Sequence, residues 1–211
     1  MFTGIIELKV ATTMMAGWMA ATSPVPMPVE TMAVMVDGRT AAPVEVKLYD
    51  ENMRVSATVV IERDGSMDPE TKKQVTQVFR CRQTKRSHPI AQQTLAMLAD
   101  IADRHDGKTI EFVSAYRVPR GESRTSPHRH ARAIDFRIRG IKLREMRDYL
   151  WRRYTEVGIG WYPSEQYIHM DTRPTLHDTS WTFIRGKNHY KPYWADLARR
   201  PPRPARRGPG V

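Results

Sequence analysis

The sequence of 211 residues predicts an α+β domain with a central antiparallel sheet and helices on one face. Two observations lead to this fold class. Several segments alternate apolar and polar residues with the period of two that strands show. Other segments repeat apolar residues every three or four positions, as helices do when one side covers a sheet. Hydrophobic residues make up 40% of the chain, which is enough for a buried core.

The first half of the domain is predicted to contain two strands and then two helices. Residues 44–49 and 54–61 are the strands, and the second is rich in Val and Thr. Residues 68–70 read Asp-Pro-Glu and mark a helix start, because Asp caps a first turn and Pro suits the first helical position. The second helix spans 91–104 and is rich in alanine and leucine, which favour helices. Both helices are expected to cover the back of the sheet.

The second half adds more strands and one more helix. The predicted strands are 109–116, 133–138, 157–161 and 166–171. Residues 142–153 form an amphipathic helix with its arginines outward. Beyond Trp181, further aromatic residues predict one strand and a short helix.

Two separate segments carry the residues that indicate chemistry. Residues 126–135 read Ser-Pro-His-Arg-His-Ala-Arg-Ala-Ile-Asp, and residues 167–171 read Tyr-Ile-His-Met-Asp. The alternation of each strand places Asp135 and His169 on the side away from the core. If the two strands pair, both side chains lie on the same face of the sheet, and the loop before Asp135 can bring His128 over that face. Two histidines and a carboxylate are ligands that Zn²⁺ prefers when one position stays open to water. The sequence therefore predicts a zinc cleft on the face opposite the helices.

These segments belong to an ordered pattern that resembles a known bacterial family. The matching pieces are Tyr116-Arg117, Ser126-x-His128, Ala133-x-Asp135, the run 158–163 (Gly-Ile-Gly-Trp-Tyr-Pro) and His169-x-Asp171. The pattern is similar to the zinc D-Ala-D-Ala carboxypeptidases and murein endopeptidases, which share a fold with lysostaphin and the Hedgehog signalling domain. It covers about a third of the chain. One departure is Ala131, where the family usually has glycine.

The resemblance implies an enzyme that hydrolyses amide bonds in peptidoglycan cross-links or stem peptides. Zn²⁺ is then the cofactor, and peptidoglycan peptides are the partners. A catalytically silent zinc-containing module that binds the cell wall is the alternative, because one fold supports several functions.

A carboxylate that accepts a proton is also required, and two candidates are available. Asp171 is the first, since it shares a strand face with His169; its alternative role is to hold a histidine ring from behind the metal. Glu165, in the preceding turn, is the second. Relatives place an acidic residue three positions before the histidine, and this chain has Gln166 there.

The remaining site residues follow from the same pattern. Arg117 is expected to bind a substrate carboxylate or stabilise an oxyanion, with a structural ion pair as the alternative. Tyr116, Ser126 and Tyr162 are assigned to substrate binding, and core packing is the alternative for Tyr162.

The two ends of the chain differ in character from the domain, which is predicted to span 44–198. Residues 1–43 are a leader or linker, and the short apolar run after Lys9 followed by prolines resembles a weak signal peptide. That run is too short for a membrane span. We therefore expect a periplasmic or exported protein, with a cytoplasmic one as the alternative.

Charge is concentrated near the C-terminus. The chain has a formal net charge of +11, and residues 185–211 contain eight Lys or Arg and one Asp. The Arg- and Pro-rich tail, 199–211, is predicted to be disordered. It is either a solvated tail or a segment attracted to an anionic envelope polymer or lipid. Specific binding of nucleic acid is not expected, because no aromatic platform or groove-reading helix accompanies the tail.

A single cysteine, Cys81, limits the remaining possibilities. One cysteine excludes both a disulfide framework and a zinc site built from several cysteines.

Overall fold

The computed structural model describes residues 42–175 and 177–199, and all structural statements concern these residues. The strands are β1 Val44–Asp50, β2 Val55–Ile61, β3 Ile110–Ser114, β4 Ala133–Ile138, β5 Val157–Tyr162, β6 Tyr167–Thr172, β7 Thr179–Ile184 and β8 Lys187–Tyr190. The helices are α1 Pro69–Val78, α2 Gln92–Arg104, α3 Leu143–Arg153 and α4 Tyr193–Arg199, with a 3-10 turn, η1, at Pro127–His130. Apart from residues 42–43 and Arg199, the predicted leader and tail lie outside the described residues.

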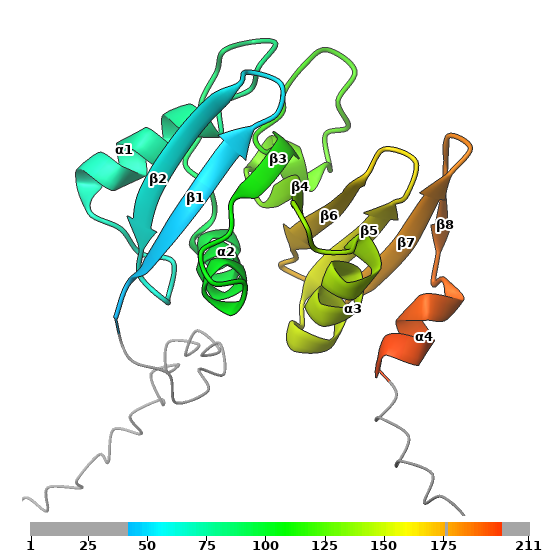
Figure 1. Ribbon diagram of the computed structural model, residues 1–211. Coiled ribbons are helices and arrows are strands. Elements are labelled where there is room, and N and C mark those ends of the chain that lie inside the picture. The colour runs from blue at the N-terminus through cyan, green and yellow to red at the C-terminus, as the bar shows by residue number, and fades with distance from the viewer. Residues whose placement is uncertain (1–41, 176, 200–211) are drawn as a thin grey trace, which may run out of the picture. The chain divides into compact units, whose positions relative to one another are not determined.

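The strands form one sheet in the order β2-β1-β3-β4-β6-β5-β7-β8 (Figure 1). The α+β class is confirmed, but a purely antiparallel sheet is wrong, because β1 pairs with β3 and β5 pairs with β7 in parallel. The first parallel pair arises because β2, α1 and α2 all lie between β1 and β3, and this long crossover returns the chain to the same end of the sheet. The second arises because the segment after β6 crosses to the far side of β5.

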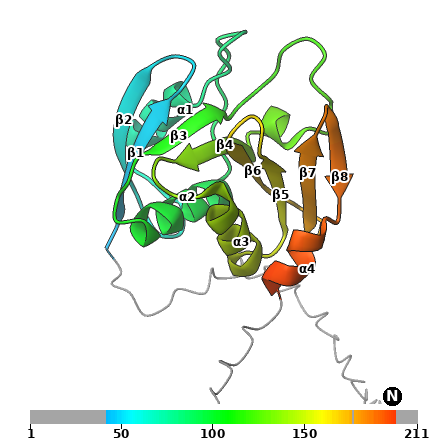
Figure 2. The ribbon, with the colours of Figure 1, turned by 45° about the vertical axis from the view of Figure 1, so that its right-hand side comes forward.

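Helices pack on one face of this sheet, as the apolar spacing predicts (Figure 2). The buried cluster combines α2 and α3 with alternate residues of the two central strands: Leu95, Leu98, Ile101, Met146, Leu150, Ile134, Phe136, Ile168 and Met170. Burying each such side chain fully contributes about 1.5–3 kcal/mol. The intervening residues of β4 and β6 must therefore point to the opposite face.

Register between β4 and β6 fixes which side chains meet on that opposite face. Asp135 lies directly across from His169, and Ile134 lies across from Met170. A shift by one residue would exchange the polar and apolar faces of a strand, so burial of the apolar set holds the polar set in register.

Local signals explain most element boundaries. The α1 start is confirmed, because the Asp68 carboxylate accepts hydrogen bonds from the backbone N–H groups of Glu70 and Thr71, both at 3.0 Å. Beyond Trp181 the sequence predicts one strand and a short helix; the helix is confirmed as α4, but β7 and β8 form a hairpin in place of a single strand. All four residues of β8 are exposed, so it has no burial alternation that a sequence pattern would display.

Within the described residues, no helix has the length and apolar character that crossing a bilayer requires.

Asp100 links α2 to α3 through a cluster of hydrogen bonds. Its carboxylate accepts from the hydroxyls of Tyr149 at 2.7 Å and Tyr154 at 2.5 Å, and from the Arg153 guanidinium at 3.2 Å. Burial alone would raise the pKa of Asp100, but the hydrogen bonds from Tyr154, Tyr149 and Arg153 outweigh it and lower that pKa. Burial and the neighbouring carboxylate raise the pKa of Tyr149 to about 12.

We predict that Asp100→Asn lowers the free energy of unfolding by about 1–2 kcal/mol at pH 7. The folded-state pKa of Asp100 lies below its unfolded value, so its stabilisation is present above the unfolded pKa of about 3.9 and is lost as the pH falls through the folded value. Urea unfolding at pH 7 and at pH 3 should show that the difference from wild type shrinks at the lower pH. Asp106→Asn, an exposed change beyond α2, is the control. An equal difference at both pH values would contradict this account.

Candidate metal site

A cavity of about 530 Å³ lies on the sheet face opposite the helices. Its walls include the three predicted ligands and several residues assigned to catalysis or substrate binding: His128, Asp135, His169, Arg117, Ser126, Tyr162 and Asp171. These residues come from β4, β5, β6, η1 and the loop before η1, so distant segments of the chain build one cavity.

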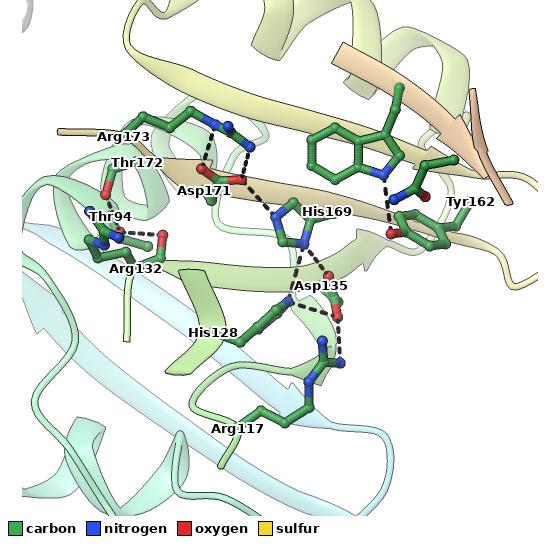
Figure 3. A network of polar contacts seen from close by, with 12 residues as sticks. Thr94, Arg117, His128, Arg132, Asp135, Tyr162, His169, Asp171, Thr172 and Arg173 are labelled. Carbon is green, nitrogen blue, oxygen red and sulfur yellow. Dashed lines mark hydrogen bonds and ion pairs between the residues drawn. The ribbon is translucent and has the colours of Figure 1, made fainter. Parts of the chain in front are cut away.

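The three predicted ligands meet at one point (Figure 3). His128 Nε2 lies 3.1 Å from His169 Nδ1 and 3.2 Å from Asp135 Oδ2, and His169 Nδ1 lies 2.8 Å from Asp135 Oδ1. Ligand atoms that surround one zinc tetrahedrally at 2.0–2.1 Å are separated by about 3.3 Å. The two nitrogens, and the carboxylate oxygen nearest to each of them, therefore have close to the separations that ligands of one zinc ion show.

Hydrogen bonds on the far side of each ring fix where the imidazole protons lie. His128 Nδ1 is 2.7 Å from the carbonyl oxygen of Ala115, which can only accept, so Nδ1 carries the proton. His169 Nε2 is 2.9 Å from Asp171 Oδ2 and likewise donates to it. In the neutral rings, His128 Nε2 and His169 Nδ1 are then lone-pair acceptors that face each other and the Asp135 carboxylate. Three converging acceptors match a bound cation, and this outward donation is the usual arrangement of histidine metal ligands.

Electrostatics at the site also favour a positive charge. Burial would raise the pKa of Asp135, but His128 and His169 hold it well below its usual range. Burial would lower the pKa of His169, but hydrogen bonds from its ring to the Asp135 and Asp171 carboxylates raise it to about 9. Two buried carboxylates thus stabilise positive charge at the His169 ring, whether a proton or a metal ion supplies it.

Asp171 is fully buried behind His169. Its Oδ2 accepts from His169 Nε2 and from Arg173 Nη2 at 3.1 Å, and its Oδ1 lies 3.0 Å from Arg173 Nε. Burial would raise the pKa of Asp171, but His169 and Arg173 lower it. Its complete burial and its hydrogen bond to His169 Nε2 favour the alternative role, that of orienting the His169 ring.

Arg117 lies at the edge of the same cluster. Its Nη1 is 3.7 Å from Asp135 Oδ2. Glu122 contacts the other side of the guanidinium, with Oε2 2.7 Å from Nε and Oε1 3.4 Å from Nη2. Glu122 thereby holds Arg117 with Nη1 directed towards the ligands.

Glu122 is the functional candidate that the sequence did not reveal. It lines the cavity, and its pKa, which burial would raise, is lowered by hydrogen bonds from Ser126 and Arg117. It lies in a polar loop without periodicity, among other charged residues, so no pattern distinguishes it from a solvated side chain.

The other predicted site residues occupy different places. Ser126 and Tyr162 line the cavity, and the Tyr162 hydroxyl accepts a hydrogen bond from Trp181 Nε1 at 3.1 Å. Tyr116 lines an adjoining cavity and packs partly against the core. Glu165 is exposed in the turn between β5 and β6 and is not among the residues that line either cavity.

Two glycines of β5 leave room for side chains beneath the site. A Cβ on Gly158 would lie 2.1 Å from Asp171 Oδ2 and 2.5 Å from Arg173 Nη2, and one on Gly160 would lie 2.4 Å from the Trp181 ring. The Gly-x-Gly part of the motif is therefore explained by close packing over strand β5. The β5 glycines are required because any larger residue would displace these neighbours.

Ala131 ends η1 in the left-handed conformation, with φ 51° and ψ 36°. A residue with a Cβ is less stable there than glycine by about 1 kcal/mol. The turn nevertheless closes, since Ala131 N donates to the His128 carbonyl at 3.1 Å and its own carbonyl accepts from Ala91 N at 2.9 Å. The departure from the usual glycine leaves the position of His128 intact.

Comparison with known proteins identifies the family. The family model described as peptidoglycan L,D-endopeptidase MepK matches residues 38–177, about two thirds of the chain. The chain therefore belongs to this family, and the family predicted from the ordered motif is confirmed.

Curated relatives agree with this membership. The peptidoglycan L,D-endopeptidase MepK of Escherichia coli (strain K12) is 31% identical over 80 residues, which cover 33% of this chain and 43% of the relative. The probable peptidoglycan L,D-endopeptidase MepK of Haemophilus influenzae is 38% identical over 58 residues, or 28% of this chain and 31% of the relative. The matched segment thus spans less than half of each relative. No solved structure is significantly similar to the chain.

We predict that Gly158→Ala weakens binding of Zn²⁺ by roughly tenfold or more, because a methyl group at this position pushes Asp171 away from His169. Competition with a chromophoric chelator measures the affinity. Gly160→Ala is the matched comparison: its methyl group meets Trp181, which packs on the His169 ring, but the hydrogen bond from that ring to Asp171 stays in place, so it should lower the melting temperature with a smaller loss of affinity. Equal zinc affinities for the two variants would refute this role of Gly158.

Proposed function

We propose that this protein is a zinc-dependent peptidase that hydrolyses amide bonds in peptidoglycan peptides. The observation that carries the proposal is the convergence of His128 Nε2, His169 Nδ1 and the Asp135 carboxylate. The two nitrogens lie 3.1 Å apart, Oδ2 of the carboxylate lies 3.2 Å from the His128 nitrogen, and Oδ1 lies 2.8 Å from the His169 nitrogen. Membership of the MepK family supports the choice of peptidoglycan as the substrate. Such a substrate lies outside the cytoplasmic membrane, so the proposal agrees with the export predicted from the N-terminal sequence.

Each side chain around the site has a separate task in this proposal. His128, Asp135 and His169 would hold Zn²⁺, which supplies a Lewis acid for the scissile carbonyl and lowers the pKa of a water molecule to about 7. Asp171 keeps the His169 ring oriented through the 2.9 Å hydrogen bond to Nε2. Arg117 directs Nη1 into the cavity, where a guanidinium stabilises the negative oxygen that develops during amide hydrolysis.

Proton transfer requires a carboxylate that faces the cavity. Among the described residues, three carboxylates line it, and two of these contact the His169 ring. We assign proton transfer to the third, Glu122. The Asp171 side chain is completely buried behind His169, whereas that of Glu122 is 13% exposed, and Glu165 is exposed in a turn outside the cavity lining.

We predict that the purified protein releases soluble peptides from cross-linked peptidoglycan, and that a chelator abolishes this release until zinc is restored. His128→Ala should lose both the bound zinc, measured by metal analysis, and the activity, because it removes one of three ligands. His88→Ala changes an exposed histidine outside the site cavity and is the matched control.

Mass analysis of the muropeptides identifies the bond that is cut. Binding to peptidoglycan without any chelator-sensitive product would contradict the enzymatic proposal and favour a silent zinc-containing binding module. Equal zinc content in wild type and His128→Ala would contradict the ligand assignment.

We predict that three carboxamide variants separate the roles of the acidic residues. Glu122→Gln should retain zinc and lose hydrolysis by roughly 10²-fold or more, because it removes the proton acceptor. Asp171→Asn should lower zinc affinity about 10- to 100-fold, because it weakens the hold on the His169 ring. Glu165→Gln should change neither quantity appreciably. Zinc affinity and initial rates are measured on the same preparations. Full activity of Glu122→Gln would exclude it as the proton acceptor.

A further inference from the structure

A second cavity, of about 240 Å³, adjoins the site cavity. The two cavities share Arg117, Asp135 and Tyr167 in their walls. The second one is also lined by Arg80 and Arg82, which follow α1. We call it the basic pocket. A water molecule occupies about 30 Å³ of liquid, so the pocket has room for a side chain with a charged end.

The two arginines that follow α1 are held by different contacts: Arg80 Nη1 donates to the Gln77 carbonyl of α1 at 2.7 Å, and Arg82 contacts the turn between β1 and β2. Tyr116 N donates to the Phe79 carbonyl at 3.1 Å, which ties the start of this segment to the end of β3. Arg82 Nη1 donates to Asn52 Oδ1, and Asn52 Nδ2 donates to the Val113 carbonyl at 2.7 Å. Asn52 uses one of the five N–H donors of Arg82, so the guanidinium is anchored at the pocket wall with donors left for a ligand.

Charges in the wall favour an anion. Three arginines line the basic pocket against two carboxylates, Asp50 and Asp135. Asp50 Oδ1 accepts from the backbone N–H groups of Asn52 at 2.8 Å and Met53 at 2.9 Å, so that oxygen is engaged by the β1–β2 turn. Asp135 is turned to His128 and His169. The positive charge at Arg80 and Arg82 is therefore not matched by either acid, and planar guanidinium groups bind carboxylates in pairs of hydrogen bonds.

We propose that the basic pocket binds a free carboxylate of the peptide substrate, on a residue next to the scissile amide. The proposal rests on the proposed peptidase function, because the shared wall at Arg117 and Asp135 places this carboxylate beside the reacting bond. Arg80 and Arg82 then select acidic stem peptides over their amidated counterparts. Their task is substrate recognition, distinct from the metal ligands and from the proton acceptor.

The test uses two synthetic peptides that differ only in a free carboxylate or a carboxamide beside the target amide. Calorimetry on chelator-treated protein measures binding without hydrolysis. Wild type should bind the carboxylate peptide about tenfold more tightly, the factor expected for a lost charge-assisted hydrogen bond. Arg80→Gln and Arg82→Gln should each reduce this preference severalfold. Arg86→Gln, an exposed change in the same loop outside the pocket lining, should retain it.

Thermal unfolding of each variant checks that the variants used in the binding measurements are folded. Equal binding of the two peptides by wild type, or an undiminished preference in both Arg80→Gln and Arg82→Gln, would overturn the basic pocket. Either result would leave the proposed hydrolysis standing, because peptidoglycan digestion is measured separately. Loss of digestion with an intact preference would instead overturn the peptidase and retain the carboxylate site.

Discussion

The mutual approach of three buried acceptor atoms is the constraint on which this site depends. Two imidazole nitrogens and a carboxylate oxygen would repel one another without a positive charge between them, and each is buried where water cannot fully solvate it. Their positions are held from outside, by the Ala115 carbonyl behind His128 and by Asp171 behind His169. The surrounding fold thus fixes a geometry that the three acceptors alone would not adopt.

This constraint extends outward through successive contacts. Arg173 engages both oxygens of Asp171, and the room for that pair exists because Gly158 has no side chain. On the other side, Glu122 fixes the guanidinium of Arg117. A site of this kind requires rigid support, because small displacements of a ligand weaken both metal affinity and catalysis. The apolar face of β4 and β6, packed on α2 and α3, supplies that rigidity.

Much of this arrangement could be predicted because it follows from alternation. Asp135 and His169 alternate with the apolar residues of their strands, and packing of those apolar residues in the core decides the face and register of both. The roles of Asp171 and Glu122 could not be predicted in the same way. Asp171 lies two residues from His169 and so shares its side of the strand, but only the contacts in the fold show that it faces His169 Nε2 and Arg173. Glu122 depends on loop geometry, which has no period. The parallel pairs of the sheet were missed because strand patterns do not encode the direction of a neighbouring strand.

Arg117 lies between the site cavity and the basic pocket and contributes to the walls of both. Glu122 contacts its Nε and Nη2 while Nη1 lies towards Asp135. A peptide that filled both cavities would have to pass this guanidinium. The peptide atom nearest to Arg117 would then lie where the two cavities meet, beside Asp135. That junction is where an amide carbonyl would need to be for the proposed hydrolysis. A guanidinium fixed there can act on the developing oxyanion without reorganising, which is the condition under which electrostatic stabilisation is most effective. The two interpretations of Arg117, a structural ion pair and an oxyanion-stabilising group, are therefore compatible. The ion pair with Glu122 fixes the guanidinium in the position from which it would act on the substrate.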